Sequence, residues 1–304
     1  MDKEKLRTEL YDKQYNSKYD ESKFIIFNME YGGFGAMLAR RKLALQFGLY
    51  FNRIVLLNYT NYLYDEPFKN ISNFNLNDIK NEGIKIFNYD LNQKDKVVFF
   101  NFNNYWNNSL IKNTFHEKSL YNLDFKDFSG LLLNFFQLKE NYQKLLNDKL
   151  KKLNLKDRTI GIHIRRGDKE LETPYIPMYI FIEELNKVKE KTGINNVYIC
   201  SDSTNAIYEL MNSLKEFNIT YDTAEIRHED KIWHPPGPSN KESETFIGIK
   251  NIEILTNCDY IIGQSNVQFA KISVCKSIDK KNKLDVFSLI NPLDLKKVAW
   301  DIRT

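Results

Sequence analysis

The chain has 304 residues, 42% of them hydrophobic, so it is long enough for one large α/β domain or two of ordinary size and too apolar to be globally disordered. Its 44 basic and 40 acidic residues are interspersed and leave a formal net charge of +4, a pattern that argues against nucleic-acid binding. The three cysteines lack CxxC spacing and the four histidines are scattered, so we expect buried, reduced thiols and no metal centre.

The beginning of the chain is charged and has no apolar core, and no apolar run is long enough to span a bilayer. We therefore expect no signal peptide, no transmembrane segment and a soluble, cytoplasmic protein. The polar stretch 1–22 predicts a short helix followed by a loop.

A strand, a glycine-rich turn, a helix and a second strand follow. The apolar run 23–28 predicts a buried strand, which leads through the glycine-rich segment 29–36 into a helix over 37–47 and a strand over 53–57. Glycines at such a turn open a helix N-terminus to an anion or a sugar, although they can equally serve only the packing of the turn. Their spacing is not GxGxxG, so a nicotinamide or flavin site is not indicated.

Residues 58–124 are rich in Asn, Tyr, Phe and Lys, and short strands are expected near 84–87 and 96–100. From residue 131 to residue 153, Leu, Phe and Tyr recur at helical spacing while Lys, Glu and Asn fill the other face. This pattern predicts one long amphipathic helix. We place the domain boundary after it, so that the first domain covers 1–155 and the second 156–304.

The second half opens with Thr159–Lys169, TIGIHIRRGDK, an apolar run that breaks abruptly into charge. Two guanidiniums at the carboxyl end of a buried strand are unfavourable unless a multivalent anion binds them, and ligands bind at that end of open α/β sheets. The segment therefore predicts a phosphate-bearing ligand. Arg165 is the better candidate, with an ion pair to Asp168 as its alternative; Arg166 points to the other face, whereas His163 shares the face of Arg165.

The rest of the second half alternates strands and helices, as expected for a parallel sheet. Strands are predicted at 196–200, 225–226, 259–263 and 286–290, and helices at 179–191, 205–214, 243–257 and 269–276.

Polar side chains follow three of these strands, and in a parallel sheet such ends lie side by side. Asp202 follows the second strand, where it can bind a ribose or a sugar or cap the next helix. The third group offers donors before a helix N-terminus, suited either to phosphate or to capping: Ser265, Asn266 and Gln268. The candidates for a catalytic acid or base are Asp168, Glu170 and Glu172, which the sequence does not separate.

Four segments resemble, in the same order, motifs of the alpha-1,6-fucosyltransferase family. Segment 160–169 resembles its first motif, 31–38 its glycine-rich loop, 197–202 its second motif and 251–268 its third. The alpha-1,2-fucosyltransferases and protein O-fucosyltransferases are more distant kin. The agreement spans roughly residues 24–278.

The resemblance implies an α/β, GT-B-like fold of two Rossmann-type domains, with the acceptor side in 1–155 and the nucleotide-binding half in 156–304. It also implies an inverting, metal-independent glycosyltransferase without a cofactor. Such an enzyme would move fucose from GDP-fucose to a sugar hydroxyl of a glycan, glycolipid or surface polysaccharide. The alternatives are the same fold with another sugar nucleotide, or a non-catalytic protein that binds a nucleotide or glycan.

Carried over to this sequence, the resemblance makes Arg165 the residue that holds the β-phosphate and helps the diphosphate leave. His163 would contact the nucleotide, and Asp202 would lie at the donor site. The other donor-binding residues would be Ser265, Asn266 and Gln268 at the phosphates and Gly33, Phe34 and Gly35 from the first domain.

The sequence departs from the family at several points. Thr173 stands where the core N-glycan enzymes have their base, so the base stays open among the three carboxylates named above. Asn251 stands where an acidic guanine-reading residue is expected, which leaves the nucleotide base open. The family's membrane anchor, coiled coil and SH3 domain have no counterpart here, so we expect a bacterial or viral enzyme of polysaccharide or glycolipid biosynthesis. The sequence does not predict an oligomeric state.

Overall fold

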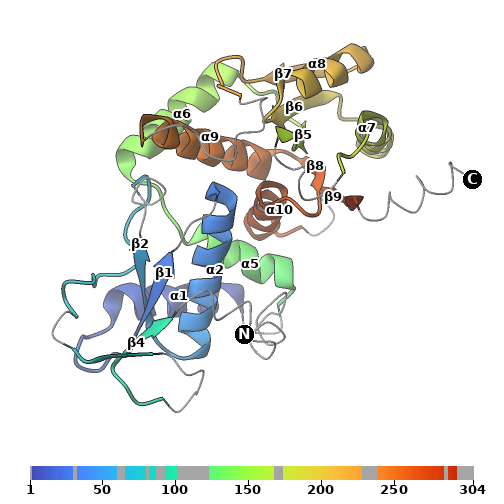
Figure 1. Ribbon diagram of the computed structural model, residues 1–304. Helices are drawn as coiled ribbons and strands as arrows, with labels where there is room; N and C mark the ends of the chain where they lie inside the picture. Colours follow the sequence, from blue (N-terminus) through green and yellow to red (C-terminus); the bar gives the residue numbers. More distant parts are fainter. Residues whose placement is uncertain are drawn as a thin grey trace, which may run out of the picture. The chain divides into compact units, whose positions relative to one another are not determined.

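The computed structural model describes residues 2–29, 33–59, 66–79, 82–86, 93–100, 123–167, 174–227, 238–283 and 287–292. It divides into two compact units, residues 1–139 and 140–304 (Figure 1). Each contains an all-parallel sheet with helices, so the predicted α/β class with two parallel-sheet domains is confirmed. Within the described part, no helix has the length and apolar character needed to cross a bilayer. All three cysteines are buried and free of disulfides.

The first unit contains a four-stranded sheet in the order β2-β1-β4-β3. Its elements are α1 (Lys3–Tyr11), the π-helix η1 (Asp12–Asn16), β1 (Phe24–Met29), α2 (Phe34–Tyr50), β2 (Ile54–Tyr59), β3 (Ile84–Ile86), β4 (Val97–Phe100) and α5 (Phe125–Asn134). The predicted strand, helix and second strand are thus β1, α2 and β2, since β1 and β2 pair in parallel. Residues 30–32 of the predicted glycine-rich turn lie outside the described residues.

Helix α2 covers one face of this sheet. Phe47 of α2 lies against Phe27 of β1 and Phe100 of β4, with ring centroids 5.8 and 4.9 Å away. The helix approaches β2 so closely that a Cβ at Gly48 would lie 2.3 Å from the Cγ2 of Val55, so only glycine fits there. This packing holds the N-terminus of α2 at the carboxyl edge of the sheet.

The second unit contains a five-stranded sheet in the order β7-β6-β5-β8-β9. Its elements are α6 (Glu140–Leu153), β5 (Thr159–Ile164), α7 (Met178–Thr192), β6 (Asn196–Ser201), α8 (Thr204–Ser213), β7 (Asn218–Tyr221), α9 (Pro238–Asn257), β8 (Tyr260–Gln264), α10 (Gln268–Lys281) and β9 (Phe287–Ile290). If the five strands are numbered from 1 in chain order, their order across the sheet is 3-2-1-4-5, as in Rossmann folds. The strand order therefore reverses between β5 and β8.

Helices lie on both faces of this sheet (Figure 1). Helices α7 and α8 pack on one face, where the alternate residues Ile160, Ile162 and Ile164 of β5 enter one hydrophobic cluster. Helices α9, α10 and α6 cover the other face. A Cβ at Gly161 of β5 would lie 2.8 Å from the Sγ of Cys258, so glycine allows α9 to lie directly on the central strand. The strand is buried on both faces, as its apolar run predicted.

Two predicted elements are wrong. The long helix over 131–153 is two helices, α5 and α6, because the chain between them pairs with residues 67–69 instead of coiling. The backbone N–H of Lys69 donates to the carbonyl of Gln137 (2.8 Å), and that of Lys139 donates to the carbonyl of Pro67 (2.9 Å). The strand predicted at 225–226 is β7, seven residues earlier, and Ile226 is exposed in the turn that follows it.

Helix α6 belongs to the second unit, whereas the sequence placed it before the boundary. Leu150 and Leu153 of α6 pack against a cluster that contains Tyr198 of β6. In addition, the Nζ of Lys149 lies 2.8 Å from the carboxylate of Asp222. Contacts with β6 and with the residue after β7 therefore hold this helix in the second unit, and the boundary lies near residue 139.

Candidate functional site

The carboxyl ends of β6, β5 and β8 are neighbours in the second sheet, so the predicted convergence of three polar strand ends is confirmed. Strand β5 pairs with β6 as far as Ile164 and Ser201, but with β8 only as far as Ile162 and Ile262. The chain therefore leaves the ladder earlier on the β8 side. This edge, where the strand order reverses, is the position at which open α/β sheets bind ligands.

Arg165 lies at the centre of this edge. Its guanidinium forms an ion pair with the carboxylate of Asp202, and its backbone N–H donates to the Oε1 of Gln264 (2.8 Å). The side chains of Arg165 and Asp202 remain 34% and 21% exposed, so the pair is within reach of a ligand. The sequence did not suggest this partner for Arg165. The partner considered from the sequence, Asp168, lies outside the described residues.

Asp202 does not cap α8, so the capping alternative considered for it is wrong. Ser203 is the N-cap of α8 and accepts from the N–H of Ala206 (3.2 Å). The carboxylate of Asp202 turns instead toward β5, where it accepts from the backbone N–H of Arg166 (2.7 Å) besides pairing with Arg165. Asp202 therefore supplies a carboxylate to both residues of the arginine segment.

The turn after β5 is tight. Gly167 has a φ of +52°, and a Cβ there would lie 2.8 Å from the Oδ2 of Asp202. The hydroxyl of Tyr175 donates to the carbonyl of Gly167 (2.6 Å), and its ring lies 5.0 Å from the guanidinium carbon of Arg166. Burial lowers the pKa of Arg166, and its Nη1 has no hydrogen-bond partner in the described ranges. Arg166 is thus braced by Tyr175, with one donor left over.

His163 lies on the α10 side of β5, only 5% exposed, with its ring stacked on Phe269 at a centroid distance of 5.7 Å. Burial, followed by the charge of Arg165, lowers its pKa to about 3. The ring is therefore neutral at physiological pH and carries one donor and one acceptor. Its Nδ1 has no hydrogen-bond partner among the residues that the structure covers.

Helix α10 begins beside these groups without a side-chain cap, because its N-cap is Val267. The capping role considered for Ser265, Asn266 and Gln268 is therefore wrong. Ser265 and Asn266 are half-buried and Gln268 is exposed. An uncapped N-terminus of a 14-residue helix presents free N–H groups and a partial positive charge, which suits a phosphate.

Sequence reasoning missed Gln264, the last residue of β8. It is fully buried, and its Oε1 accepts from the backbone N–H of Arg165 (2.8 Å). Its Nε2 has no partner in the part of the chain described here. One signal in the sequence could have found it: Gln264 is a polar residue at the end of an otherwise apolar strand, YIIGQ, and it directly precedes Ser265.

In the first unit, Gly33 is the N-cap of α2, and Phe34 and Gly35 begin the helix. This N-terminus also lacks a side-chain cap. A Cβ at Gly33 would meet nothing within 4 Å, so packing does not require glycine there. The candidate bases Asp168, Glu170 and Glu172 lie outside the described residues. Within the described ranges, no three or more His, Cys, Asp or Glu side chains form a group that could hold a metal ion.

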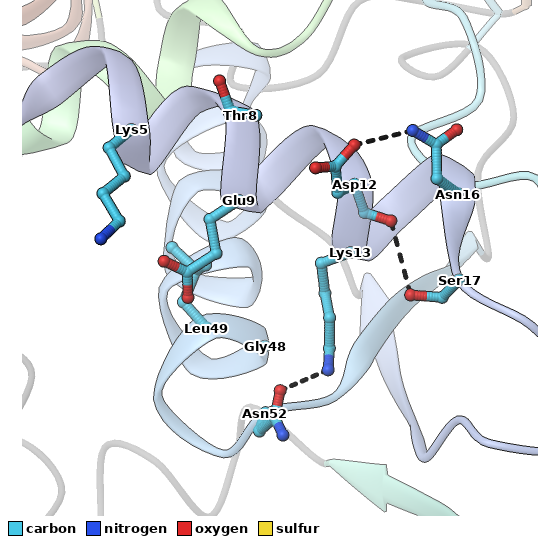
Figure 2. A pocket seen from close by; sticks show the side chains of 10 residues that line it. All are labelled: Lys5, Thr8, Glu9, Asp12, Lys13, Asn16, Ser17, Gly48, Leu49 and Asn52. Carbon is cyan, nitrogen blue, oxygen red and sulfur yellow. Dashed lines mark hydrogen bonds between the residues drawn. The ribbon is translucent and has the colours of Figure 1, made fainter.

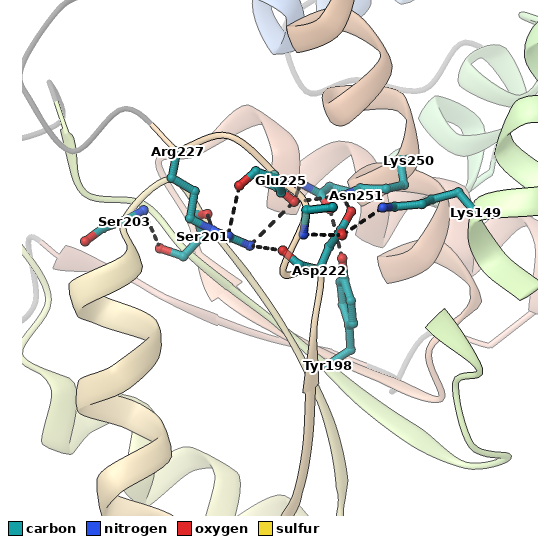
Figure 3. A network of polar contacts seen from close by, with 10 residues as sticks. Lys149, Tyr198, Ser201, Ser203, Asp222, Glu225, Arg227, Lys250 and Asn251 are labelled. Atoms are coloured by element: carbon teal, nitrogen blue, oxygen red, sulfur yellow. Dashed lines mark hydrogen bonds and ion pairs between the residues drawn. The ribbon is translucent and has the colours of Figure 1, made fainter. Parts of the chain in front are cut away.

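A second polar cluster, which we call the Lys250 network, lies at the end of β7 (Figure 3). The Nζ of Lys250 contacts the carboxylates of Asp222 (2.6 Å) and Glu225 (2.7 Å). Burial raises the pKa of Asp222, but hydrogen bonds from Lys149 and Lys250 outweigh it, so that the net pKa is lowered. Arg227 donates to the carbonyls of Asp222 (2.8 Å), Glu225 and Ser201 (both 3.2 Å).

Asn251 belongs to the same network. Its Nδ2 donates to the Oε1 of Glu225 (3.1 Å), and its Oδ1 accepts from the hydroxyl of Tyr198 (3.0 Å). Burial, the largest cause, raises the pKa of Tyr198 well above its ordinary value, so the hydroxyl stays a donor. Asn251, which replaces the expected acidic residue, thus lies directly beside a carboxylate supplied by the preceding turn.

An open depression of about 530 Å³ lies in the first unit, between α1 with η1 and the end of α2 (Figure 2). Lys5, Glu9, Asp12 and Lys13 line it, and the Nζ of Lys13 donates to Asn52. It lies beside the residues that precede β2, at the amino edge of the first sheet, and no residue predicted for the site lines it. Its charges balance, so it does not select an anion.

No protein-family model and no curated protein matches this sequence. Several solved structures, in contrast, are similar to this chain in fold. The fucosyltransferase NodZ from Bradyrhizobium superposes with a TM-score of 0.55 at 11% identity, over 84% of this chain and 92% of its own; NodZ was also crystallised with GDP. POFUT1 in complex with GDP-fucose gives 0.52 at 11% identity, over 88% and 98%. A variant of FUT1 from Arabidopsis thaliana, in complex with GDP, gives 0.52 at 11%, over 91% and 73%. The chain thus has the α/β, GT-B-like fold of these fucosyltransferases, as the resemblance implied.

Proposed function

We propose that this protein is a glycosyltransferase that moves fucose from GDP-fucose to a sugar hydroxyl. The observation that carries the proposal is the guanidinium of Arg165, which is partly exposed at the point where the strand order reverses. Helix α10, which follows the neighbouring strand β8, begins at the same edge of the sheet without a side-chain cap. The similar solved structures are fucosyltransferases, and several hold GDP or GDP-fucose. The diphosphate of GDP is an anion that would suit both the exposed Arg165 and the helix N-terminus.

In the proposed complex, the second unit binds the nucleotide. Arg165 contacts the β-phosphate and stabilises the charge that develops on the leaving diphosphate, so no metal ion is required. The N–H groups at the start of α10 bind the remaining phosphate oxygens, together with Ser265, Asn266 and Gln268. The neutral ring of His163 contacts the nucleotide, and Asp202 lies at the donor sugar. Gly33, Phe34 and Gly35 of the first unit border the nucleotide.

The proposed reaction is a direct displacement. The acceptor oxygen forms a bond to the anomeric carbon of fucose, and the bond from that carbon to the phosphate oxygen breaks. GDP leaves with the electron pair, and the configuration inverts. A carboxylate takes the acceptor proton; the candidates are Asp168, Glu170 and Glu172. The acceptor would bind on the side of the first unit. We propose a glycolipid- or polysaccharide-linked sugar as acceptor and the cytoplasm as the location.

The test begins with thermal-shift screening of the purified protein against nucleotides and sugar nucleotides, followed by an assay of GDP release from GDP-fucose with a panel of acceptors. We expect GDP and GDP-fucose to raise the melting temperature and GDP release to continue in the presence of EDTA. Release from another sugar nucleotide but not from GDP-fucose would overturn the donor assignment. Binding of GDP without turnover of any donor would instead support a non-catalytic binding protein.

A further inference from the structure

The main chain at Arg165 and Arg166 is held by side chains rather than by the sheet. The ladder between β5 and β8 stops at Ile162 and Ile262. Beyond it, the N–H of Arg165 donates to the side chain of Gln264 from β8, at 2.8 Å. One residue later, the N–H of Arg166 donates to the side chain of Asp202, the residue that follows β6. A side chain from the end of each flanking strand thus takes the place of a backbone partner.

The orientation of the Gln264 amide follows from this bond. A backbone N–H only donates, so the atom that faces Arg165 is the oxygen, and the Nε2 is the end without a partner among the described residues. Gln264 is fully buried, so this donor is shielded from water. A buried donor without a partner is unfavourable, so native structures contain few of them and each one calls for an explanation.

We propose that Gln264 is a positioning residue for the donor site: its Oε1 fixes the main chain of Arg165, so that the guanidinium is held at the carboxyl edge where a diphosphate binds. Its contribution lies in the placement of Arg165 rather than in the stability of the unit. The identity of the ligand rests on the function proposed above, whereas the contact with Arg165 does not.

The first unit offers a matched control. Gln14 is also a buried glutamine whose Oε1 accepts from a backbone N–H, that of Val55 (3.3 Å), and whose Nε2 has no partner in the described ranges. Gln14 belongs to η1 of the first unit, and its side chain contacts the amino end of β2. Replacing either glutamine by methionine removes the same kind of contact at nearly constant volume.

The experiment measures GDP affinity by calorimetry for the full chain, for Gln264→Met, for Arg165→Ala and for the double variant. Loss of one hydrogen bond that places Arg165 should weaken GDP binding by about threefold to tenfold. In the Arg165→Ala background, the same change should alter affinity by less than about twofold, because positioning acts through Arg165. Gln14→Met should leave GDP affinity unchanged.

An equal loss in both backgrounds would overturn the proposal, since Gln264 would then act independently of Arg165. If Gln264→Met does not fold, Gln264→Asn replaces it, because the shortened side chain no longer reaches the N–H of Arg165. Hydrogen exchange tests the contact without any ligand: the amide of Arg165 should exchange faster in Gln264→Met than in the unmodified protein, and unchanged exchange would also overturn the proposal. A protein that binds no GDP at all, yet shows this faster exchange, would refute the proposed function and leave the contact established.

Discussion

The Lys250 network and the Arg165 edge are both polar clusters of the second unit, yet they differ in how completely their groups are paired. In the network, Lys250 and Asp222 are 1% and 4% exposed, and their ion pairs with each other, with Glu225 and with Lys149 satisfy both charges (Figure 3). At the edge, the Arg165 pair is partly exposed, and three polar atoms have no hydrogen-bond partner in the described ranges: His163 Nδ1, Arg166 Nη1 and Gln264 Nε2.

This difference separates a structural cluster from a candidate ligand site better than charge alone does. A buried group that lacks a partner is unfavourable, so native structures contain few of them. A paired network needs no further partner, whereas unpaired polar groups at the carboxyl edge of a parallel sheet are suited to bind a polar ligand. The comparison makes four predictions, which we take from the largest expected effect to the smallest.

Loss of the Lys250 charge from its network should lower the stability of the fold without affecting the Arg165 edge. Lys250→Met leaves Asp222 and Glu225 buried without their shared partner, so we expect the free energy of unfolding to fall by about 3–5 kcal/mol in urea denaturation. Lys149→Met, which removes a more exposed partner of the same carboxylate, should have a smaller effect. A large loss of GDP affinity in folded Lys250→Met would contradict the separation of the two clusters.

Loss of the edge arginine should have the opposite profile. Arg165→Ala is expected to weaken GDP binding by about 2–5 kcal/mol in calorimetry, because the phosphate loses a partly desolvated guanidinium as its partner. The stability of the fold should change little. Arg158→Ala serves as the control, since Arg158 is exposed at the amino end of the same strand. Unchanged GDP affinity in Arg165→Ala would remove the main support for the site.

The burial of His163 should appear in the pH dependence of stability. Its pKa is about 3 in the folded chain, below the ordinary value of 6.5, so below that value the unfolded chain binds the proton first. Its effect is absent at pH 8 and should reduce the free energy of unfolding by about 2 kcal/mol at pH 5. The measurement compares urea unfolding of the unmodified protein and His163→Gln. Parallel pH profiles would show that the ring titrates normally.

The smallest effect concerns the anion that Arg165 already holds. Asp202→Asn removes a carboxylate that competes with the diphosphate and keeps an acceptor for the N–H of Arg166. GDP binding should therefore become tighter by about 1 kcal/mol, measured at constant ionic strength. Weaker binding would mean that Asp202 orients Arg165 for the diphosphate and does not compete with it.

Local patterns predicted much of the fold and part of the site. The apolar run before Arg165 marked the central strand, and polar residues after apolar strands marked three neighbouring ends. The break between α5 and α6 was not predictable, because helical spacing continues across it and the cause is pairing with a distant segment around Phe68. Likewise, the sequence does not decide whether Asp202 or Ser203 caps α8. The structure decides it, because Asp202 accepts from Arg165 and Arg166, which leaves Ser203 to accept from the N–H of Ala206.

Gln264 shows why the rest of the site escaped prediction. A glutamine at the end of a strand has many possible partners, and its importance follows from one bond to a residue 99 positions away. The Lys250 network was missed for the same reason, since Lys149, Asp222 and Lys250 come from three separate elements.

The position of α6 decides how the protein can be divided for expression. A recombinant fragment that starts at residue 156, the boundary predicted from the sequence, would expose the surface on which Leu150 and Leu153 pack. It would also lack Lys149, one of the two lysines that pair with the buried carboxylate of Asp222. A fragment that starts at residue 140 keeps both contacts and is the better choice for NMR titration of the isolated half with nucleotides.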